Sequence, residues 1–244
     1  MQNRVIIYGD LHGCFEEFIE LRNKINPTVF DREIVLGDIL DKGPFEIELL
    51  KYLRENKIES ILGNHEDKYI RYFKHLKLFE ETGKEIEVKL TSSQLDLFNK
   101  LSRDDLEYLE SFPSFLKIEN LTLVHGGLTN DIDLENLSKK DIKMIVRLRY
   151  LNENNIVSHV NHKNEYNERW AKFYDGNQGI VVYGHQIFDD VMYDKFSIGI
   201  DTGCVYGNKL SAMIVTDTKN PMENHQIVKV DAKASYFKEK ILSK

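Results

Sequence analysis

The chain has 244 residues with 30% charged residues and a net charge of −7, the composition of an ordinary globular protein with room for one large α/β domain. The acidic balance excludes a broad nucleic-acid surface, which needs clustered Lys and Arg, but allows an anionic substrate, because bound divalent metals reverse the charge locally. No apolar run reaches the roughly 18 residues of a membrane span and no secretory signal follows Met1, so we expect a cytoplasmic protein with no membrane partner.

The first part of the chain predicts repeated strand–loop–helix units. Strands are expected over 4–9, 33–36 and 58–62, and helices over 14–25, 45–56 and from 63 to about 78. The apolar residues of 4–9 do not alternate with polar ones, which is typical of a strand buried on both faces. Short connections between such units predict a parallel sheet with right-handed crossovers.

Two segments without clear strands interrupt this pattern. Residues 79–113 predict a helical insert that covers one side of a cleft, with helices over 93–101 and 103–112 and N-caps at Ser92 or Ser93 and at Ser102. Short strands return at 115–118, 121–125, 180–183, 197–200 and 210–216, with a last strand near 226–230. Residues 134–174, rich in Asn and charge, predict a mostly helical excursion. No repeat or linker divides the chain, so a single domain over 1–244 is expected.

Five predicted strands end in a glycine next to Asp, Asn or His. Ligands bind at the carboxyl ends of strands in open α/β sheets, so these polar side chains are expected to meet at one edge. They are Asp10 with His12, Asp38 with Asp41, Asn64 with His65, His125, and His185.

Carboxylate oxygens combined with imidazole nitrogens suit manganese, iron, zinc or a similar ion. Asp10 and His12 lie two residues apart, so in extended geometry both would point the same way. Asp38 can offer one oxygen to each of two metals, and a second metal can take the carbonyl oxygen of Asn64 and the imidazoles of His125 and His185. Two such ions can hold a bridging hydroxide and support in-line attack on phosphorus.

His65 directly follows Asn64, so its side chain is expected to point away from the metals and towards the leaving group. An imidazole held there by the carboxylate of Asp41 would be a general acid with its tautomer fixed.

Each of these matches alone has an ordinary explanation, such as a turn residue or a histidine buried in the core. The joint pattern argues for a metal site, because four of the eight histidines fall at strand ends beside glycine or Asn. We expect the other four at the surface: His75, His159, His162 and His225.

The ordered motifs resemble those of the calcineurin-like metallophosphoesterases. They are Gly9-Asp10-Leu11-His12-Gly13, the segment from Gly37 to Gly43, Gly63-Asn64-His65-Glu66, His125-Gly126-Gly127 and Gly184-His185. More narrowly, the chain resembles the phosphoprotein phosphatase branch, with likenesses to symmetrical diadenosine tetraphosphatases and bacterial Ser/Thr protein phosphatases. The resemblance covers about residues 5–215 and implies an α/β fold in which a two-sheet β-sandwich is flanked by helices.

The resemblance also implies the roles of the site residues. Asp10, His12 and Asp38 would hold one divalent metal, and Asp38, Asn64, His125 and His185 a second. His65 and Asp41 would be the acid dyad. Manganese is the expected metal, with iron, zinc, nickel, cobalt or magnesium as alternatives.

The phosphate-binding residues depart from the family in one position. Lys42 stands where the family usually has Arg, which keeps the charge but loses the bidentate fork. Arg147 and Arg149 are expected to form a second phosphate clamp on one face of an extended segment, although a basic stretch on a solvated helix would have the same spacing.

The sequence therefore predicts a hydrolase of phosphomonoesters, phosphoproteins or dinucleoside tetraphosphates, whose partner is the phosphorylated small molecule, nucleotide or protein it cleaves. The alternatives are an enzyme for nucleic-acid ends or cyclic phosphates and a non-catalytic scaffold of the same fold. A scaffold would be expected to lose ligands, above all His65, and here every one is present.

Overall fold

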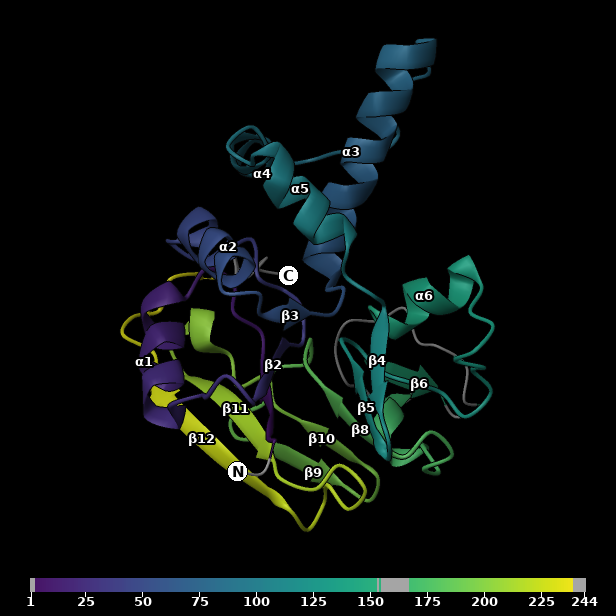
Figure 1. The fold of residues 1–244 in the computed structure, drawn as a ribbon. Helices are drawn as coiled ribbons and strands as arrows, with labels where there is room; N and C mark the ends of the chain where they lie inside the picture. The colour runs from purple at the N-terminus through teal and green to yellow at the C-terminus, as the bar shows by residue number, and fades with distance from the viewer. Residues whose placement is uncertain (1–2, 153, 155–166, 239–244) are drawn as a thin grey trace.

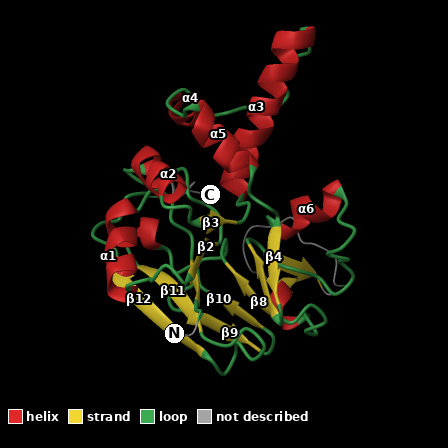
Figure 2. Ribbon diagram, in the orientation of Figure 1, coloured by secondary structure: helices red, strands yellow, loops and turns green. Residues whose placement is uncertain are grey.

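The computed structural model describes residues 3–152, 154 and 167–238. Two five-stranded sheets form the centre of the molecule, with α1 and α2 on one side and α6 on the other (Figures 1 and 2). The predicted two-sheet α/β sandwich flanked by helices is confirmed.

The first sheet has the order β12-β11-β1-β2-β3. Its strands are β1 (Val5–Tyr8), β2 (Arg32–Val35), β3 (Glu59–Ser60), β11 (Lys209–Val215) and β12 (His225–Asp231). The predicted parallel pairing is found for β1, β2 and β3, whereas β11 and β12 are antiparallel and make the sheet mixed.

The second sheet has the order β4-β5-β8-β10-β9. Its strands are β4 (Phe115–Ile118), β5 (Leu121–Val124), β8 (Ile180–Tyr183), β9 (Met192–Asp194) and β10 (Ser197–Gly199). The central strands β5, β8 and β10 run parallel, and the edge strands β4 and β9 run antiparallel to their neighbours. Each sheet therefore contains three parallel strands whose carboxyl ends lie at one edge.

The strands are buried on both faces because alternate side chains enter different layers. In β1, Val5 and Ile7 pack between the sheets, whereas Ile6 and Tyr8 pack in the layer that contains α1 and α2. The layer between the sheets contains Val5, Ile7, Ile34, Leu36, Ile61, Leu121, Leu123, Val182, Ile198, Ile200, Met213 and Val215. A further apolar cluster around Trp170 packs against the second sheet.

Five helices lie in the part of the described chain before β4. They are α1 (Phe15–Ile25), α2 (Glu46–Glu55), α3 (Asn64–Thr82), α4 (Ser92–Phe98) and α5 (Arg103–Glu110). The expected insert over 79–113 thus contains the end of α3, which runs past residue 78, together with α4 and α5. Ser102 caps α5 as predicted, but Thr91 rather than Ser92 or Ser93 caps α4.

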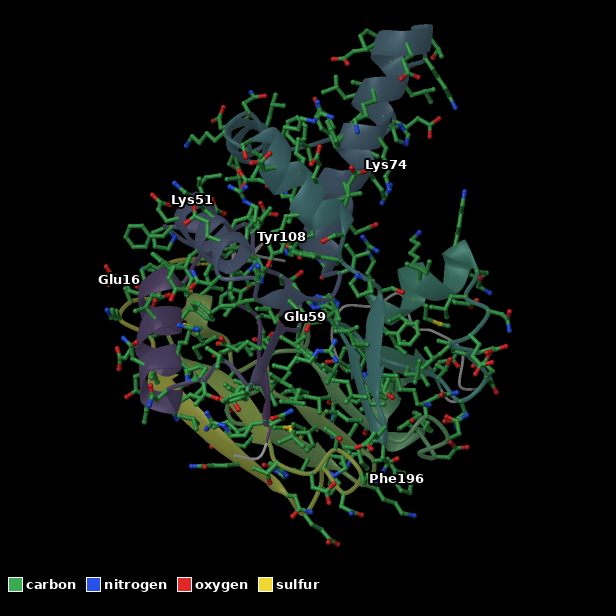
Figure 3. The ribbon with its side chains drawn as sticks, in the orientation of Figure 1. Glu16, Lys51, Glu59, Lys74, Tyr108 and Phe196 are labelled. Atoms are coloured by element: carbon green, nitrogen blue, oxygen red, sulfur yellow. The ribbon has the colours of Figure 1, made fainter. Side chains whose placement is uncertain are left out.

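Helix α5 attaches the insert to the edge of the first sheet, and α4 adds a contact through Gln94, while α3 projects beyond the sandwich (Figure 1). The hydroxyl of Tyr108 on α5 donates a hydrogen bond to the carbonyl of Ile58, 2.5 Å away, directly before Glu59 of β3 (Figure 3). Arg54 of α2 forms an ion pair with Asp105 of α5 at 3.2 Å. These contacts join the insert to the edge of the first sheet.

The mostly helical prediction for 134–174 is wrong in the described part of that segment. It contains one α-helix, α6 (Lys139–Ile145), a two-stranded ribbon of β6 (Tyr150–Asn152) and β7 (Asn167–Arg169), and the short 3-10 helix η1 (Trp170–Lys172). The ribbon pairs Leu151 with Glu168. Such a pairing of residues that are not neighbours in sequence produces no local hydrophobic pattern from which it could be predicted. His159 and His162 lie outside the described residues. None of the described helices is long and apolar enough to cross a membrane.

Candidate metal centre

Five of the six parallel strands deliver side chains to one cavity of about 150 Å³, and His125, which follows the sixth, β5, lies directly behind it against Asp38. Asp10 and His12 follow β1, Asp38 and Lys42 follow β2, His65 follows β3 at the start of α3, and His185 and Asp201 follow β8 and β10. Further residues complete the lining, which as a whole consists of Asp10, His12, Asp38, Lys42, His65, Arg149, His185, Ile187, Asp201, Tyr206 and Phe237. The predicted convergence of strand ends is therefore found.

The loops that carry these residues have an uncommon backbone. His12, Asp38, Asp41, Lys42 and His185 all have φ between 41° and 76°. Left-handed conformations of residues other than glycine are uncommon and cluster at functional sites. The extended geometry expected for Asp10 and His12 is therefore wrong at His12, whose φ is 41°; a turn rather than a strand brings its ring to the cavity.

Asp38 lies at the centre of the cluster. One of its carboxylate oxygens is 3.2 Å from Nε2 of His125, and the other is 3.5 Å from Nε2 of His12 and 3.8 Å from Nε2 of His65. Burial opposes the charge of Asp38, but the surrounding histidines, His125 foremost, hold its pKa well below the usual range. Asp38 is therefore an anion with one oxygen directed at each half of the cluster.

Backbone carbonyls orient two of the histidines. Nδ1 of His12 is 2.8 Å from the oxygen of Leu40, and Nδ1 of His125 is 2.7 Å from that of Leu36. A proton on each Nδ1 donates to its carbonyl, so the lone pair of Nε2 is on the side of the ring that faces Asp38, as in metal-bound histidines, whose other nitrogen donates to a carbonyl.

The third histidine carries an unsatisfied polar atom. Nε2 of His185 is buried and has no hydrogen-bond partner within the described part of the chain. Burial lowers the pKa of His185 well below its usual range and that of His12 to about 3, where the charge of Lys42 adds to the effect. Both imidazoles are neutral, the form that binds metals.

The predicted ligands Asn64 and Asp10 also belong to this cluster. Oδ1 of Asn64 is 3.1 Å from Nε2 of His125. The carboxylate of Asp10 accepts hydrogen bonds at 3.1 and 3.2 Å from the backbone N–H of His185. Glycine permits this approach, because a Cβ on Gly184 would lie 2.1 Å from Oδ1 of Asp10 and one on Gly63 would lie 2.4 Å from Oδ1 of Asp38.

Three carboxylates, those of Asp10, Asp38 and Asp201, are buried close together, which is costly even with the ammonium group of Lys42 beside them. Burial raises the pKa of Asp10 well above its usual range, and the charges of Asp201 and Asp38 raise it further. Burial also raises the pKa of Asp201. The acidic oxygens, the neutral imidazoles and the unsatisfied Nε2 together fit divalent metal ions.

The predicted dyad of His65 and Asp41 is assembled. Nδ1 of His65 is 2.5 Å from the carboxylate of Asp41, which also accepts hydrogen bonds from the hydroxyl of Tyr69 and, at 2.8 Å, from Nε2 of Gln94. Burial lowers the pKa of His65, but the carboxylates of Asp38 and Asp41 outweigh it and the pKa is raised. His65 does not point away from the cluster as expected, because its ring centroid lies 4.8 Å from that of His12.

Two acidic residues at the site were not predicted. Glu66 is fully buried and accepts hydrogen bonds from the backbone N–H groups of Asp38, Ile39 and Leu40, at 2.8 to 3.0 Å, so it fixes the loop after β2. Asp201 lines the cavity itself. The sequence holds a signal for each of them: Glu66 is the last residue of the Gly-Asn-His-Glu motif, and Asp201 follows β10, which ends in a glycine.

The three predicted phosphate-binding residues do not all lie at the cavity. Lys42 and Arg149 line the cavity, and Arg149 donates a 3.2 Å hydrogen bond to the carbonyl of His185. Arg147 is not part of the lining and forms a 2.5 Å ion pair with Asp67. The two arginines therefore do not share one face of an extended segment, because the backbone N–H of Arg147 still bonds to Met144 in the turn that ends α6.

A two-sheet sandwich whose parallel strands bring Asp, Asn and His to one buried cluster defines a metal-dependent phosphoesterase. The model of the calcineurin-like phosphoesterases matches residues 3–226, and the chain belongs to this family. The resemblance drawn from the sequence motifs is thereby confirmed, and the chain is a hydrolase of the class that works with divalent metal ions.

Individual proteins with a related sequence or fold support this family assignment. The bis(5'-nucleosyl)-tetraphosphatase PrpE (asymmetrical) of Oceanobacillus iheyensis is 31% identical over 226 residues, 86% of this chain and 87% of the relative. A solved structure provisionally described as a diadenosine tetraphosphatase has a TM-score of 0.73 at 24% identity, over 95% of each chain. A serine/threonine phosphatase of Saccharomyces cerevisiae has a TM-score of 0.58 at 18% identity, over 96% of this chain and 81% of that one.

Proposed function

We propose that this chain hydrolyses dinucleoside tetraphosphates with two divalent metal ions, manganese first among them. The observation that carries the proposal is the PrpE relative, which is 31% identical over most of both chains. The mixed set of carboxylate, amide and imidazole ligands suits manganese, as it suits iron, zinc or a similar ion, since oxygen and nitrogen donors are both present.

The proposed ligands fall into two groups that share Asp38. Asp10, His12 and Asp38 hold one ion, and Asp38, Asn64, His125 and His185 hold the other. Donor atoms of Asp38, His125 and His185 within 4.8 Å of one another support the second group. When bound, the ions supply Lewis acidity and an activated water for attack on phosphorus.

The remaining residues act on the phosphate chain. Lys42 and Arg149 neutralise and orient the phosphoryl oxygens, and His65 donates its Nε2 proton to the leaving oxygen. Asp41 holds the ring of His65 through Nδ1 and stabilises its protonated form. We retain Arg149 alone from the predicted arginine clamp, because Arg147 forms its ion pair with Asp67.

The test is a substrate panel assayed with manganese. Wild-type protein is expected to cleave diadenosine tetraphosphate with a higher kcat/KM than a phosphoserine peptide, an aryl phosphate or a 2',3'-cyclic nucleotide. Unequal products, ATP and AMP, are expected by analogy with the relative called asymmetrical, whereas two ADP would match the resemblance to symmetrical enzymes. A higher kcat/KM for the peptide or the cyclic nucleotide would contradict the proposed substrate.

Variants test the roles within the site. Asp38→Asn removes the shared anion and His65→Asn removes the acid, so each is expected to lower kcat by a factor of about 10² to 10⁴. His75→Asn is the matched control, since His75 lies on α3 outside the cavity lining. Wild-type turnover in Asp38→Asn or His65→Asn would refute the assigned role.

A further inference from the structure

Three apolar side chains line the metal cavity without belonging to the ligand set. Ile187 follows β8, Tyr206 ends the 3-10 helix η2 (Cys204–Tyr206), and Phe237 belongs to the segment after β12. Ile187 is 48% exposed and Phe237 is 37% exposed. Residues that line a cavity and remain this exposed lie at its opening, in contact with whatever part of a substrate extends out of it.

The segment that carries Phe237 is held firmly by hydrogen bonds. The backbone N–H groups of Tyr236 and Phe237 both donate to the carbonyl of Val205 at 3.0 Å. The hydroxyl of Tyr236 and the N–H of Lys233 donate to one carboxylate oxygen of Glu17 on α1, at 2.7 and 2.9 Å.

This anchoring is specific, because Glu17 is only 1% exposed and its buried carboxylate accepts both of these hydrogen bonds from the segment. The anchor does not need the ring of Phe237, since the backbone, Tyr236 and Lys233 supply the contacts. An exposed ring on a fixed backbone is preorganised, which lowers the entropic cost of binding a ligand.

The aromatic edge continues into the cationic part of the cavity. The rings of Tyr206 and Phe237 have centroids 6.1 Å apart and are nearly perpendicular, and Nζ of Lys42 lies 5.3 Å from the centroid of the Tyr206 ring. A phosphate bound by Lys42 would therefore have an aromatic surface beside it. A nucleotide, with an anionic chain and a flat base, has this combination of groups.

The size of the cavity also indicates that the phosphates and the nucleoside of a nucleotide would bind in different places. Its volume of about 150 Å³ is below the roughly 300–1,000 Å³ of pockets that enclose a drug-sized ligand. The cavity accommodates phosphates, and a nucleoside attached to them has to lie outside, at the opening. A protein partner is a poorer fit to this opening, because a protein interface has roughly 20–30 residues on each side and only three side chains are present here.

We propose that Phe237, supported by Tyr206 and Ile187, forms a subsite on which one nucleobase of the dinucleoside tetraphosphate stacks. The proposal rests on the proposed function and adds the group that recognises the nucleoside. Phe237 is thus a binding and specificity residue, whereas Glu17 and Tyr236 position it.

The experiment compares binding of two ligands that share the phosphate chain and differ in the base. The ligands are a non-hydrolysable, methylene-bridged diadenosine tetraphosphate and inorganic tripolyphosphate, titrated calorimetrically into manganese-loaded protein. Phe237→Ala is expected to raise the Kd of the dinucleotide roughly 5- to 150-fold, the range for loss of one stacked base. The Kd of tripolyphosphate is expected to change less than about twofold, since its contacts are ionic.

Two further variants separate stacking from structure. Phe237→Trp keeps a stacking ring and is expected to retain dinucleotide affinity. Phe79→Ala removes a 48% exposed ring on α3, outside the cavity lining, and is expected to bind both ligands as the wild type does.

Two outcomes would overturn the subsite. One is an unchanged dinucleotide Kd in Phe237→Ala. The other is an equal loss of affinity for both ligands with a lower Tm, which would make Phe237 a structural residue. A failed proposed function is distinguishable, because wild-type protein would then bind tripolyphosphate without preferring the dinucleotide.

Discussion

At the scale of single residues, the acid dyad gives a pH dependence with a defined sign. The pKa of His65 is raised because nearby carboxylates outweigh the effect of burial. The proposed acid is active when protonated, so kcat is expected to be high below this raised pKa and to fall as the pH rises through it.

Asp41→Asn tests this dependence. Loss of the carboxylate removes a charge that favours the protonated ring, so the alkaline limb of the kcat profile is expected to move to lower pH by about one unit or more. Tyr69→Phe, which removes only a neutral hydrogen bond to Asp41, should shift the limb less. A limb that stays in place while kcat falls would show that Asp41 does not act through the pKa of His65.

The two arginines provide a second prediction at this scale. Arg149→Ala is expected to weaken tripolyphosphate binding by roughly 10- to 150-fold, the range for a lost charge-assisted hydrogen bond. Arg147→Ala should leave the Kd within about twofold and lower the free energy of unfolding by less than about 1 kcal/mol, because its ion pair is partly exposed. Calorimetric titration of both variants measures the difference, and equal losses would refute the assignment.

At the scale of elements, the first turn of α3 holds the loop after β2 in place. Glu66 contributes a buried carboxylate to three backbone N–H groups of that loop. Its pKa is raised to about 7 by burial and by the charge of Asp38. The helix thereby sets the position of Asp38, the ligand shared by both proposed metals.

Glu66→Gln is expected to lower manganese affinity by roughly 10- to 100-fold, as loss of groups that orient metal ligands does. An amide presents one N–H₂ to backbone donors and cannot accept all three hydrogen bonds. Glu80→Gln is the control, the same substitution at an exposed position of α3. Manganese titration measures the affinity of each variant, and far-UV circular dichroism checks that α3 is intact. Unchanged affinity in Glu66→Gln would contradict the positioning role.

The elements also separate what the sequence can predict from what it cannot. Apolar runs such as residues 180–183 identify strands because burial on both faces needs no alternation. The ribbon of β6 and β7 was not predicted, because its pairing joins residues far apart in the chain. The turn at His12 could not be predicted from the sequence, because its left-handed φ of 41° depends on the loops packed around it.

At the scale of the molecule, convergence of the site follows from topology. Parallel strands in both sheets end at one edge, so polar residues after each strand meet regardless of their separation in sequence. The fold class, and the meeting of the proposed metal ligands at one edge, could therefore be predicted from strand-end motifs. The contact between Tyr236 and Glu17, 219 positions apart, could not, because neither residue stands in a motif.

The central claim is that this convergence creates a site for two divalent cations. Crystals grown with manganese, measured at wavelengths on both sides of the manganese absorption edge, test it most directly. The account predicts two anomalous peaks in the cavity, one beside Asp10 and His12, one beside Asn64, His125 and His185, and Asp38 between them. A cavity without such peaks, with Asn64, His125 and His185 turned away from Asp38, would contradict it.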